Sequence, residues 1–472
     1  MREKLKNRVT RRDLLRGALL GGGGLAVLGG LGVAQRLATA RAAVPDAPDR
    51  RYIFVYFPGG WDVLLGLDPR DPVRFHDGNL RQTLIQPGYD QLVGTDARLI
   101  EAGGLTFGPY IGDLARHADK VCVVRGMSMD TLTHDVGRRR FLTGKPPSGL
   151  LARGSSASTW LAAYYGGEEP IPNLSVKVEA YNRDQPDFAS ALQVQGVDDL
   201  LRALRPSEPR LSSNLRRQID ATLSEAAACP GERRSAIWRA AESGRTKARE
   251  MAGGELASLF DFAARTPEME ALRDFYGFTA TQGASPEAAA ALAVQAITHD
   301  VSRVVSITVT ESLDTHFTDW TTDQGPRQAR GFAAVSRMIE DLASRPYRGS
   351  GESWLDHTVI VGFSEFSRTA LLNTRGGRDH HLTNSCFLAG GSIRGGQAIG
   401  ASSDVGMNPQ PVNRTTGRVD PDGEVIRPEH ILQTLYDEVG VGDGADLRVP
   451  ACRNDPANPC DDRITLPVML RG

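Results

Sequence analysis

The sequence predicts an α/β protein with a doubly wound, mostly parallel sheet that carries helices on both faces. Three observations predict this class. Short apolar runs rich in β-branched residues recur along the chain. They lack the alternation of apolar and polar residues that is typical of a sheet with one solvent-exposed face. Stretches of helical character separate these runs. One longer stretch, at about 212–278, has a helical composition and no strand signal, which predicts a helical insertion.

The expected elements follow in chain order. Strands are expected at 52–57 (YIFVYF), 120–124 (KVCVV), 174–178, 304–309 (VVSITV), 358–363 (TVIVGF) and 386–388. Ser285-Pro286-Glu287 combines a capping residue, a proline at the first helical position and an acid, so a helix is expected from there to about Thr298. The last clear helix is expected at 428–439, after a long loop at 402–423 that is rich in Asp, Gly, Pro and Asn.

The amino terminus predicts export. Thr10-Arg11-Arg12-Asp13-Leu14-Leu15 precedes a weakly hydrophobic run and then small residues up to Ala42, which is the pattern of a twin-arginine signal peptide over 1–42. We therefore expect the twin-arginine export machinery as a partner and a periplasmic or secreted mature protein. A membrane anchor is the alternative, but a spanning helix needs about 20 solidly apolar residues. This run has seven glycines between Gly21 and Gly32, so no stable membrane span is expected after cleavage.

The rest of the chain is expected to form one domain. A linker at 43–51 leads into a single α/β domain at 52–450, and a tail follows at 451–472. The formal net charge is -2 with 24% charged residues, which gives no indication of a nucleic-acid partner. Cys452 and Cys460 flank a segment rich in Pro, Asn and Asp, where either one small disulfide or two free thiols would fit.

Polar residues follow several of the expected strands. Ligands bind outside the carboxyl ends of strands in α/β sheets, so these residues are expected at one edge. Carboxylates and imidazoles that converge there need a divalent cation to neutralise them. Mixed oxygen and nitrogen ligands favour one or two transition ions, such as zinc, manganese or iron. The clusters are Gly59-Gly60-Trp61-Asp62, Asp314-Thr315-His316, Glu365 and Asp379-His380-His381.

Several motifs give the chain a resemblance to a known family. The opening GGWDVLLGLDPRDP and the segments THDVGRRRFLTGKPPSG, LDTHFTDW, HTVIVGFSEFSRTALLNTRGGRDHH and CFLAGGSIRGGQAIGASSDVG resemble domain-of-unknown-function family 1501. This family is grouped with the alkaline phosphatase and sulfatase superfamily. The resemblance implies a doubly wound sheet and a site for two metal ions.

The resemblance also implies roles for single residues. Asp62 and Glu365 match the carboxylates on one metal, and Asp314 and His316 match ligands of the other. His380 matches the last histidine ligand, and the neighbouring Asp379 and His381 are possible additional ligands.

The resemblance further places His134 where the superfamily has its catalytic nucleophile. A histidine can ligate a metal or accept a phosphoryl group, but the usual Ser, Thr or Cys is absent from this position. Arg368 has the charge and geometry to bind the phosphate or sulfate of a substrate, although it could instead pair with a neighbouring carboxylate.

These observations support two main functional hypotheses. The first is an exported metal-dependent hydrolase that acts on a phosphate or sulfate ester. The alternative is a non-catalytic cell-envelope protein that keeps the fold and binds a glycan or an assembly partner, which the missing nucleophile favours. A redox enzyme is disfavoured because the sequence has no clustered cysteines and no dinucleotide-binding fingerprint.

Overall fold

The computed structural model describes residues 47–94, 96–204, 255–441 and 464–471, together with positions 212, 214–215, 217–218, 221–222 and 447. The expected signal peptide, most of the expected helical insertion, and Cys452 and Cys460 lie outside the described residues. Within the described ranges, no helix combines the length and the apolar character needed to cross a membrane.

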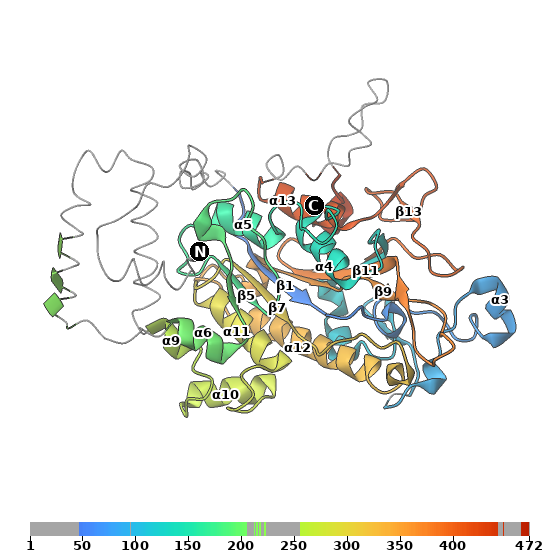
Figure 1. The fold of residues 1–472 in the computed structure, drawn as a ribbon, viewed down its shortest axis with the longest axis horizontal. Helices are drawn as coiled ribbons and strands as arrows, with labels where there is room; N and C mark the ends of the chain where they lie inside the picture. Colours follow the sequence, from blue (N-terminus) through green and yellow to red (C-terminus); the bar gives the residue numbers. More distant parts are fainter. Residues whose placement is uncertain are drawn as a thin grey trace, which may run out of the picture.

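An eight-stranded sheet forms the centre of the molecule, in the order β12-β4-β11-β8-β1-β7-β5-β6 (Figure 1). Every strand runs in the same direction except β11, which is antiparallel to both β4 and β8. This arrangement confirms the mostly parallel sheet predicted from the sequence. The strands are β1 (Arg51–Tyr56), β4 (Val121–Ser128), β5 (Asn173–Val176), β6 (Leu192–Val194), β7 (Val304–Thr308), β8 (Thr358–Phe363), β11 (Thr383–Gly390) and β12 (Gln397–Ile399).

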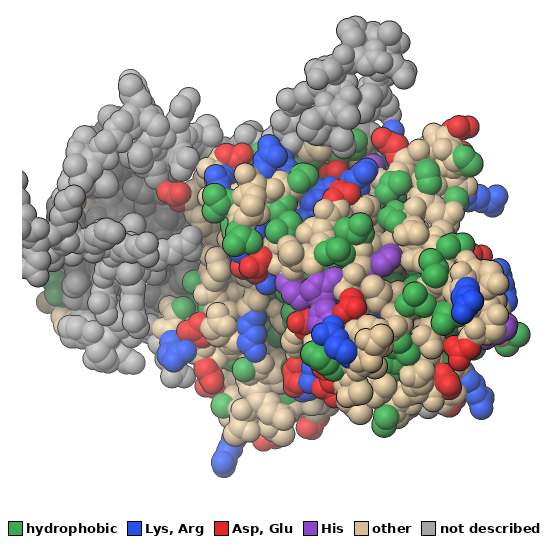
Figure 2. All heavy atoms as spheres, turned by 45° about the vertical axis from the view of Figure 1, so that its right-hand side comes forward, with side chains coloured by type: hydrophobic (Ala, Val, Ile, Leu, Met, Phe, Trp, Pro, Cys, Tyr) green, Lys and Arg blue, Asp and Glu red, His purple; other side chains and the backbone are tan. Residues whose placement is uncertain are grey.

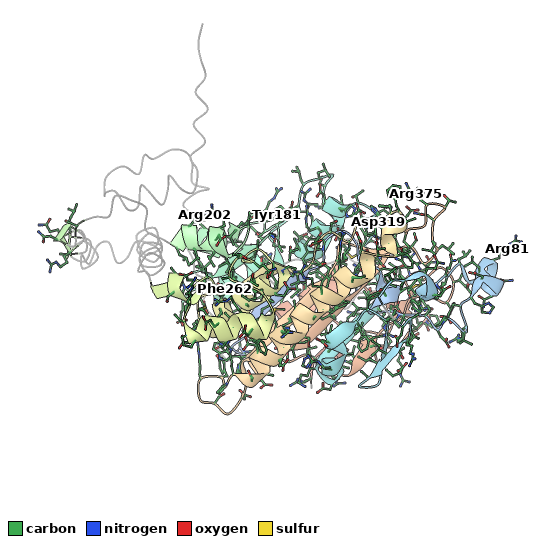
Figure 3. The ribbon with its side chains drawn as sticks, turned by 90° about the horizontal axis from the view of Figure 1, so that it is seen from below. Arg81, Tyr181, Arg202, Phe262, Asp319 and Arg375 are labelled. Atoms are coloured by element: carbon green, nitrogen blue, oxygen red, sulfur yellow. The ribbon has the colours of Figure 1, made fainter. Side chains whose placement is uncertain are left out.

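Helices cover both faces of this sheet, as the continuous apolar strands predict. Alternate side chains of β1 enter two separate hydrophobic clusters, because successive residues of a strand point to opposite faces. Ile53 and Val55 belong to the cluster of α6 (Val197–Leu204), α10 (Pro267–Tyr276), α11 (Pro286–Thr298) and α12 (Gln324–Ser344). Tyr52 and Phe54 belong to the cluster of α4 (His134–Thr143), α5 (Ala157–Tyr165) and α13 (Pro428–Glu438). Figure 3 shows the long helix α12 along the face seen from below.

The predicted helix signals are confirmed at their boundaries. Ser285 caps α11 by accepting a hydrogen bond from the backbone N–H of Ala288, and Pro286 takes the first helical position. The remaining elements are short: β2 (Ile100–Ala102), β3 (Leu105–Phe107), β9 (Ser367–Arg368), β10 (His380–His381), β13 (Pro411–Val412), β14 (Glu424–Val425), α3 (Leu80–Thr83), α9 (Glu255–Leu259), and the 3₁₀ turns η1 (Val63–Leu65), η2 (Asp77–Asn79), η3 (Tyr89–Gln91), η4 (Gly112–Lys120), η5 (Asp187–Ala189), η7 (Thr318–Trp320), η8 (Trp354–His357) and η10 (Pro467–Met469).

The topology gathers the polar segments at one edge of the sheet. The parallel strands β1, β4, β7 and β8 all end at this edge, and the antiparallel strand β11 begins there. The two-residue strands β9 and β10 pair just outside it, which sets His380 opposite Arg368. Side chains from five distant parts of the chain therefore meet in a small volume.

Candidate metal centre

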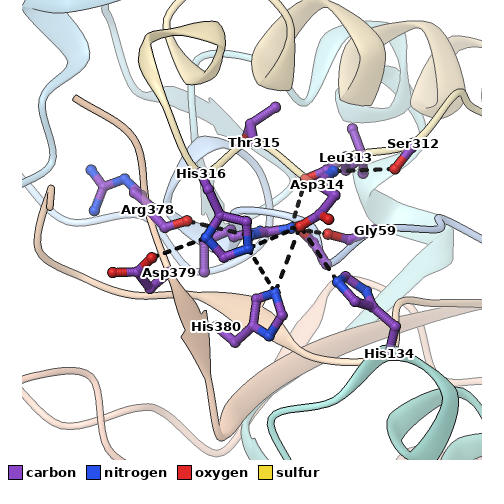
Figure 4. Close-up of polar contacts among 12 residues, drawn as sticks. Gly59, His134, Ser312, Leu313, Asp314, Thr315, His316, Arg378, Asp379 and His380 are labelled. Carbon is purple, nitrogen blue, oxygen red and sulfur yellow. Dashed lines mark hydrogen bonds and ion pairs between the residues drawn. The ribbon is translucent and has the colours of Figure 1, made fainter. Parts of the chain in front are cut away.

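Three of the predicted histidines converge on one carboxylate oxygen of a fourth predicted residue, Asp314 (Figure 4). Asp314 and His316 follow β7, His380 lies in β10, and His134 is the first residue of α4. The distances from Asp314 Oδ1 to the Nε2 atoms are 3.1 Å for His316, 3.4 Å for His134 and 3.6 Å for His380. Figure 2 shows a group of histidine side chains that reaches the surface of the molecule, with acidic and basic side chains beside it. The three imidazoles of the site are each partly buried.

The three imidazole rings share one hydrogen-bonding pattern. Nδ1 of each ring lies beside an oxygen that only accepts a hydrogen bond, so in the neutral ring the proton is assigned to Nδ1, which donates it. Nε2 of each ring then has a lone pair, which is the arrangement that metal-binding histidines show when their other nitrogen is held by an acceptor. The pairs are His134 with Glu365 Oε1 at 2.7 Å, His316 with Asp379 Oδ1 at 2.9 Å, and His380 with the carbonyl of Leu132 at 2.6 Å.

The spacing of these atoms fits a transition metal ion. His134, Asp314 and His380 form a group whose ligand atoms all lie within 4.8 Å of one another. The set of Asp314, His316 and His380 is tighter, because the two Nε2 atoms are 2.9 Å apart. Metal–ligand bonds of 2.0–2.1 Å in a tetrahedron place ligand atoms about 3.3 Å apart. The donors therefore match zinc or a similar ion in both chemistry and spacing.

Glu365 lies behind His134, on the side away from Asp314. It is buried, and its Oε1 accepts hydrogen bonds from His134 Nδ1 and from the backbone N–H of Gly59 at 2.8 Å. Burial alone would raise the pKa of Glu365, but the hydrogen bond from His134 and the backbone donors hold the pKa below its usual value. Helix α4 comes this close because Gly137 faces it: a Cβ there would lie 2.3 Å from the carbonyl oxygen of Glu365. The structure thus gives Glu365 a place beside His134 rather than among the converging donors.

Asp379 has the equivalent place behind His316. The hydrogen bond from His316 is the largest effect on the pKa of Asp379 and lowers it, and the side-chain amide of Asn373 donates to the same oxygen at 3.1 Å. His381 lies outside the group, because successive residues of a strand point in opposite directions. Its Nδ1 accepts a hydrogen bond from the backbone N–H of Thr383 at 3.2 Å.

Arg368 lies beneath the site with a fully buried side chain. Its Nη2 is 2.7 Å from Asp314 Oδ1, and its Nη1 is 3.2 Å from His316 Nε2. Burial raises the pKa of Asp314, but the hydrogen bond and the charge of Arg368 hold it below its usual value. The remaining donors of the guanidinium group go to protein oxygens, among them the carbonyls of Gly59 and Gly60. This environment favours a positioning role over the substrate contact predicted from the sequence.

Asp62 stands apart from the four converging residues. Its carboxylate is fully buried and lies 2.9 Å from Nε of Arg378, whose side chain is also fully buried. The indole N–H of Trp320 donates to Oδ2 at 2.8 Å, and the backbone N–H of Leu64 donates to Oδ1 at 3.1 Å. Burial raises the pKa of Asp62, although Arg378 and Trp320 oppose this effect. The structure therefore places Asp62 in an internal ion pair and not with the imidazoles of the candidate metal centre.

Two residues that contact the predicted ones were not themselves predicted. Phe366 is buried, and its ring centre lies 4.8 Å from that of His134 and 4.3 Å from that of His380, so it forms an apolar wall against both imidazoles. Arg378 balances the charge of Asp62. The sequence offered one signal for each residue. Phe366 is an apolar residue between Glu365 and Arg368, and Arg378 directly precedes Asp379.

Comparisons with known proteins identify the family to which the chain belongs. The sequence model of the family described as "Protein of unknown function (DUF1501)" matches residues 49–416, a range that includes the whole site. A search among curated proteins finds no match. Similar solved structures include a protein in the alkaline phosphatase superfamily from Vibrio parahaemolyticus, at 10% identity over 91% of this chain and 74% of that chain with a TM-score of 0.36.

Two further structures bear the same kind of likeness. The PsFucS1 sulfatase from Pseudoalteromonas sp. is 11% identical over 84% of this chain and 68% of that chain, with a TM-score of 0.32. The C-terminal periplasmic domain of EcEptC from Escherichia coli, in complex with Zn, is 10% identical over 84% of both chains, with a TM-score of 0.30.

Proposed function

We propose that this chain, which belongs to the DUF1501 family, is a metal-dependent hydrolase of phosphate or sulfate esters. The observation that carries the proposal is the placement of a histidine–carboxylate pair beside a three-ligand metal site. His134 turns Nε2 toward Asp314 Oδ1 at 3.4 Å while its Nδ1 donates to Glu365. A catalytic metal site keeps one coordination position open by using three protein ligands, and a base must stand beside that position.

Asp314, His316 and His380 would hold one ion, of zinc, manganese or iron. When bound, the ion supplies Lewis-acid chemistry that polarises the ester and stabilises charge on its oxygens. The sequence allowed one or two ions. The proposal has one, because Asp62 and Glu365, the expected carboxylates of the second, are occupied by Arg378 and His134.

His134 would act as the general base. The oxygen of a water molecule forms a bond to the phosphorus or sulfur atom, and the proton of that water passes to Nε2 of His134. The bond to the ester oxygen breaks, and the leaving alkoxide takes up a proton from solvent water to become the alcohol. Glu365 stabilises the imidazolium and fixes the tautomer that keeps Nε2 available. Phe366 supports the ring from one side.

A second candidate is a non-catalytic protein with a structural metal. This candidate is favoured by the same distance of 3.4 Å between His134 Nε2 and Asp314 Oδ1, which would let His134 bind the ion as a fourth ligand. Four protein ligands would complete the tetrahedron, and such closed sites are typical of structural zinc. Such a protein would bind a glycan or an assembly partner in the cell envelope.

One variant separates the two candidates. Wild type and His134→Ala would be compared for metal content and for hydrolysis of 4-nitrophenyl phosphate and 4-nitrophenyl sulfate. The hydrolase account expects metal to remain in His134→Ala and kcat to fall by about 10²- to 10⁴-fold, the usual contribution of a positioned base. Loss of metal from His134→Ala, together with an inactive wild type, would support the structural metal instead.

The proposal includes export by the twin-arginine machinery to the periplasm or the exterior, where the protein would bind the anionic ester or glycan. It is supported by Arg11 and Arg12 in the amino-terminal pattern. Cell fractionation of wild type and of a variant with both arginines changed to lysine tests it. Export that is unchanged in the variant would contradict the twin-arginine route.

A further inference from the structure

Arg375 and Phe317 form a half-exposed stacked pair beside the metal centre. The guanidinium carbon of Arg375 lies 4.6 Å from the centre of the Phe317 ring. The side chain of Arg375 is 50% exposed, and Phe317 is 53% exposed. A guanidinium over an aromatic ring is attracted by the negative face of that ring. The pair therefore presents a positive charge and an apolar surface together, and Figure 3 shows Arg375 at the outside of the molecule.

This pair is joined directly to the metal site. Phe317 follows His316 in the chain, and Arg375 Nη2 lies 3.1 Å from Asp379 Oδ1, the oxygen that accepts from His316 Nδ1 at 2.9 Å. The guanidinium group is thus on the Nδ1 side of the imidazole ring, whereas the converging donors meet at Nε2. Arg375 can therefore reach a group next to the reacting ester, but not the ester held at the metal.

The backbone holds the pair in place. Gly377 lies against the chain at His316 and Phe317, where a Cβ would come within 2.4 Å of both the carbonyl carbon of His316 and the nitrogen of Phe317. The side-chain oxygen of Asn373 accepts from the backbone N–H groups of Arg375 at 2.9 Å and Gly377 at 3.1 Å. The segment that carries Arg375 is therefore packed tightly against the segment that carries His316.

We propose that Arg375 and Phe317 form a second substrate subsite, which recognises an ester whose organic body packs on the ring and carries another anionic group. The inference rests on the proposed function and names the substrate class of that site. A guanidinium group offers paired donors that match carboxylate, phosphate and sulfate oxygens. An exposed aromatic surface beside a few placed polar groups is typical of the part of a site that holds an organic body. The substrate would carry one anion at the metal and one at Arg375.

Aryl esters that differ in one charge test the subsite. Phenyl phosphate would be compared with its 2-, 3- and 4-carboxylated derivatives, and the corresponding sulfates would be treated in the same way. The readout is the ratio of kcat/KM for the best carboxylated ester to kcat/KM for the plain ester. We expect a ratio of about 10 in wild type, the gain of one charge-assisted hydrogen bond. The ratio should be near 1 in Arg375→Gln and intermediate in Arg375→Lys.

Arg81→Gln is the matched control, because Arg81 is an exposed arginine on α3 that Figure 3 labels apart from Arg375. Its ratio should equal that of wild type. A wild-type ratio near 1, or equal losses on both kinds of ester in Arg375→Gln, would overturn the subsite while leaving the hydrolase account standing. An inactive wild type with every ester would overturn the proposed function, and the subsite with it.

Discussion

His316 and His380 face each other through their Nε2 atoms at 2.9 Å, although the Nδ1 proton of each ring is already donated to an oxygen. When both rings are neutral and protonated on Nδ1, two lone pairs at this distance repel each other, and Asp314 Oδ1 adds a negative charge beside both. A cation between the three atoms removes that conflict. Arg368, whose Nη2 lies 2.7 Å from Asp314 Oδ1, supplies part of the positive charge that is needed, and a metal ion would supply the rest.

Glu365→Gln separates a carboxylate that supports His134 from one that binds metal. We expect kcat to fall by about 10²- to 10⁴-fold with metal content unchanged, because the tautomer and charge of His134 are no longer fixed. Steady-state kinetics and metal analysis check this. The matched control is Glu352→Gln, which alters another close histidine–glutamate pair, with His357 at 2.7 Å, just before β8. Loss of metal from Glu365→Gln would instead make Glu365 a ligand.

Asp379→Ala should weaken metal binding without abolishing it. The carboxylate orients His316 from outside the converging donors, and loss of such a partner typically costs 10- to 100-fold in metal affinity. Competition with a chromophoric chelator measures the affinity. His381→Gln is the control, because His381 is two residues from Asp379 and lies outside the group of converging donors. This variant should bind metal as wild type does. A Asp379→Ala protein that binds no metal at all would show that Asp379 is itself a ligand.

Asp62→Asn should reduce stability and leave metal content intact. The change leaves Arg378 buried without its counter-charge, and breaking a buried pair in this way costs about 3–5 kcal/mol. Urea unfolding measures the loss in the free energy of unfolding. Asp314→Asn should show the opposite pattern, with metal lost and a smaller change in stability of the metal-free protein. Metal loss in folded Asp62→Asn would contradict the internal role of Asp62.

Asp49 should make stability depend on pH in acid. Burial would raise its pKa, but the hydrogen bond from Tyr347 and the charges of Arg51 and Arg303 hold the pKa well below its ordinary value of 3.8. The unfolded chain therefore binds the proton first as pH falls, so the stabilisation is present above about pH 4 and is lost progressively below it. Urea unfolding at pH 5 and pH 3 should show a gap between wild type and Asp49→Asn that narrows at pH 3. An equal gap at both values would contradict the lowered pKa.

Much of the fold could be predicted because strand signals are local. The run at 358–363 is β8 residue for residue, and Ser285 caps α11 as its sequence context predicts. The single reversed strand could not be predicted, because apolar strands buried on both faces look the same in either direction. The apolar run at 386–388 became the longer strand β11, whose direction depends on its pairing with β4 and β8.

The site was predicted as a set of residues, but not as an arrangement. The strand-end rule predicted Asp314, His316 and His380 at one edge, and the structure brings these three side chains together there. The rule could not tell the residues that converge on Asp314 Oδ1 from those that hold an imidazole at its Nδ1. The difference depends on how each ring is turned in the folded chain, as it is for His134, whose Nδ1 faces Glu365. The partner of Asp62 lies more than 300 positions away at Arg378, and only the folded chain shows that the two charges meet.

The metal content of the purified protein tests the central claim most directly. Protein prepared without chelator would be analysed by plasma mass spectrometry, as wild type and as His316→Ala. The account predicts about one equivalent of a transition metal in wild type, as one three-ligand site implies, and its loss in His316→Ala. A folded wild-type protein that binds no transition metal, even after incubation with zinc, manganese or iron, would contradict it.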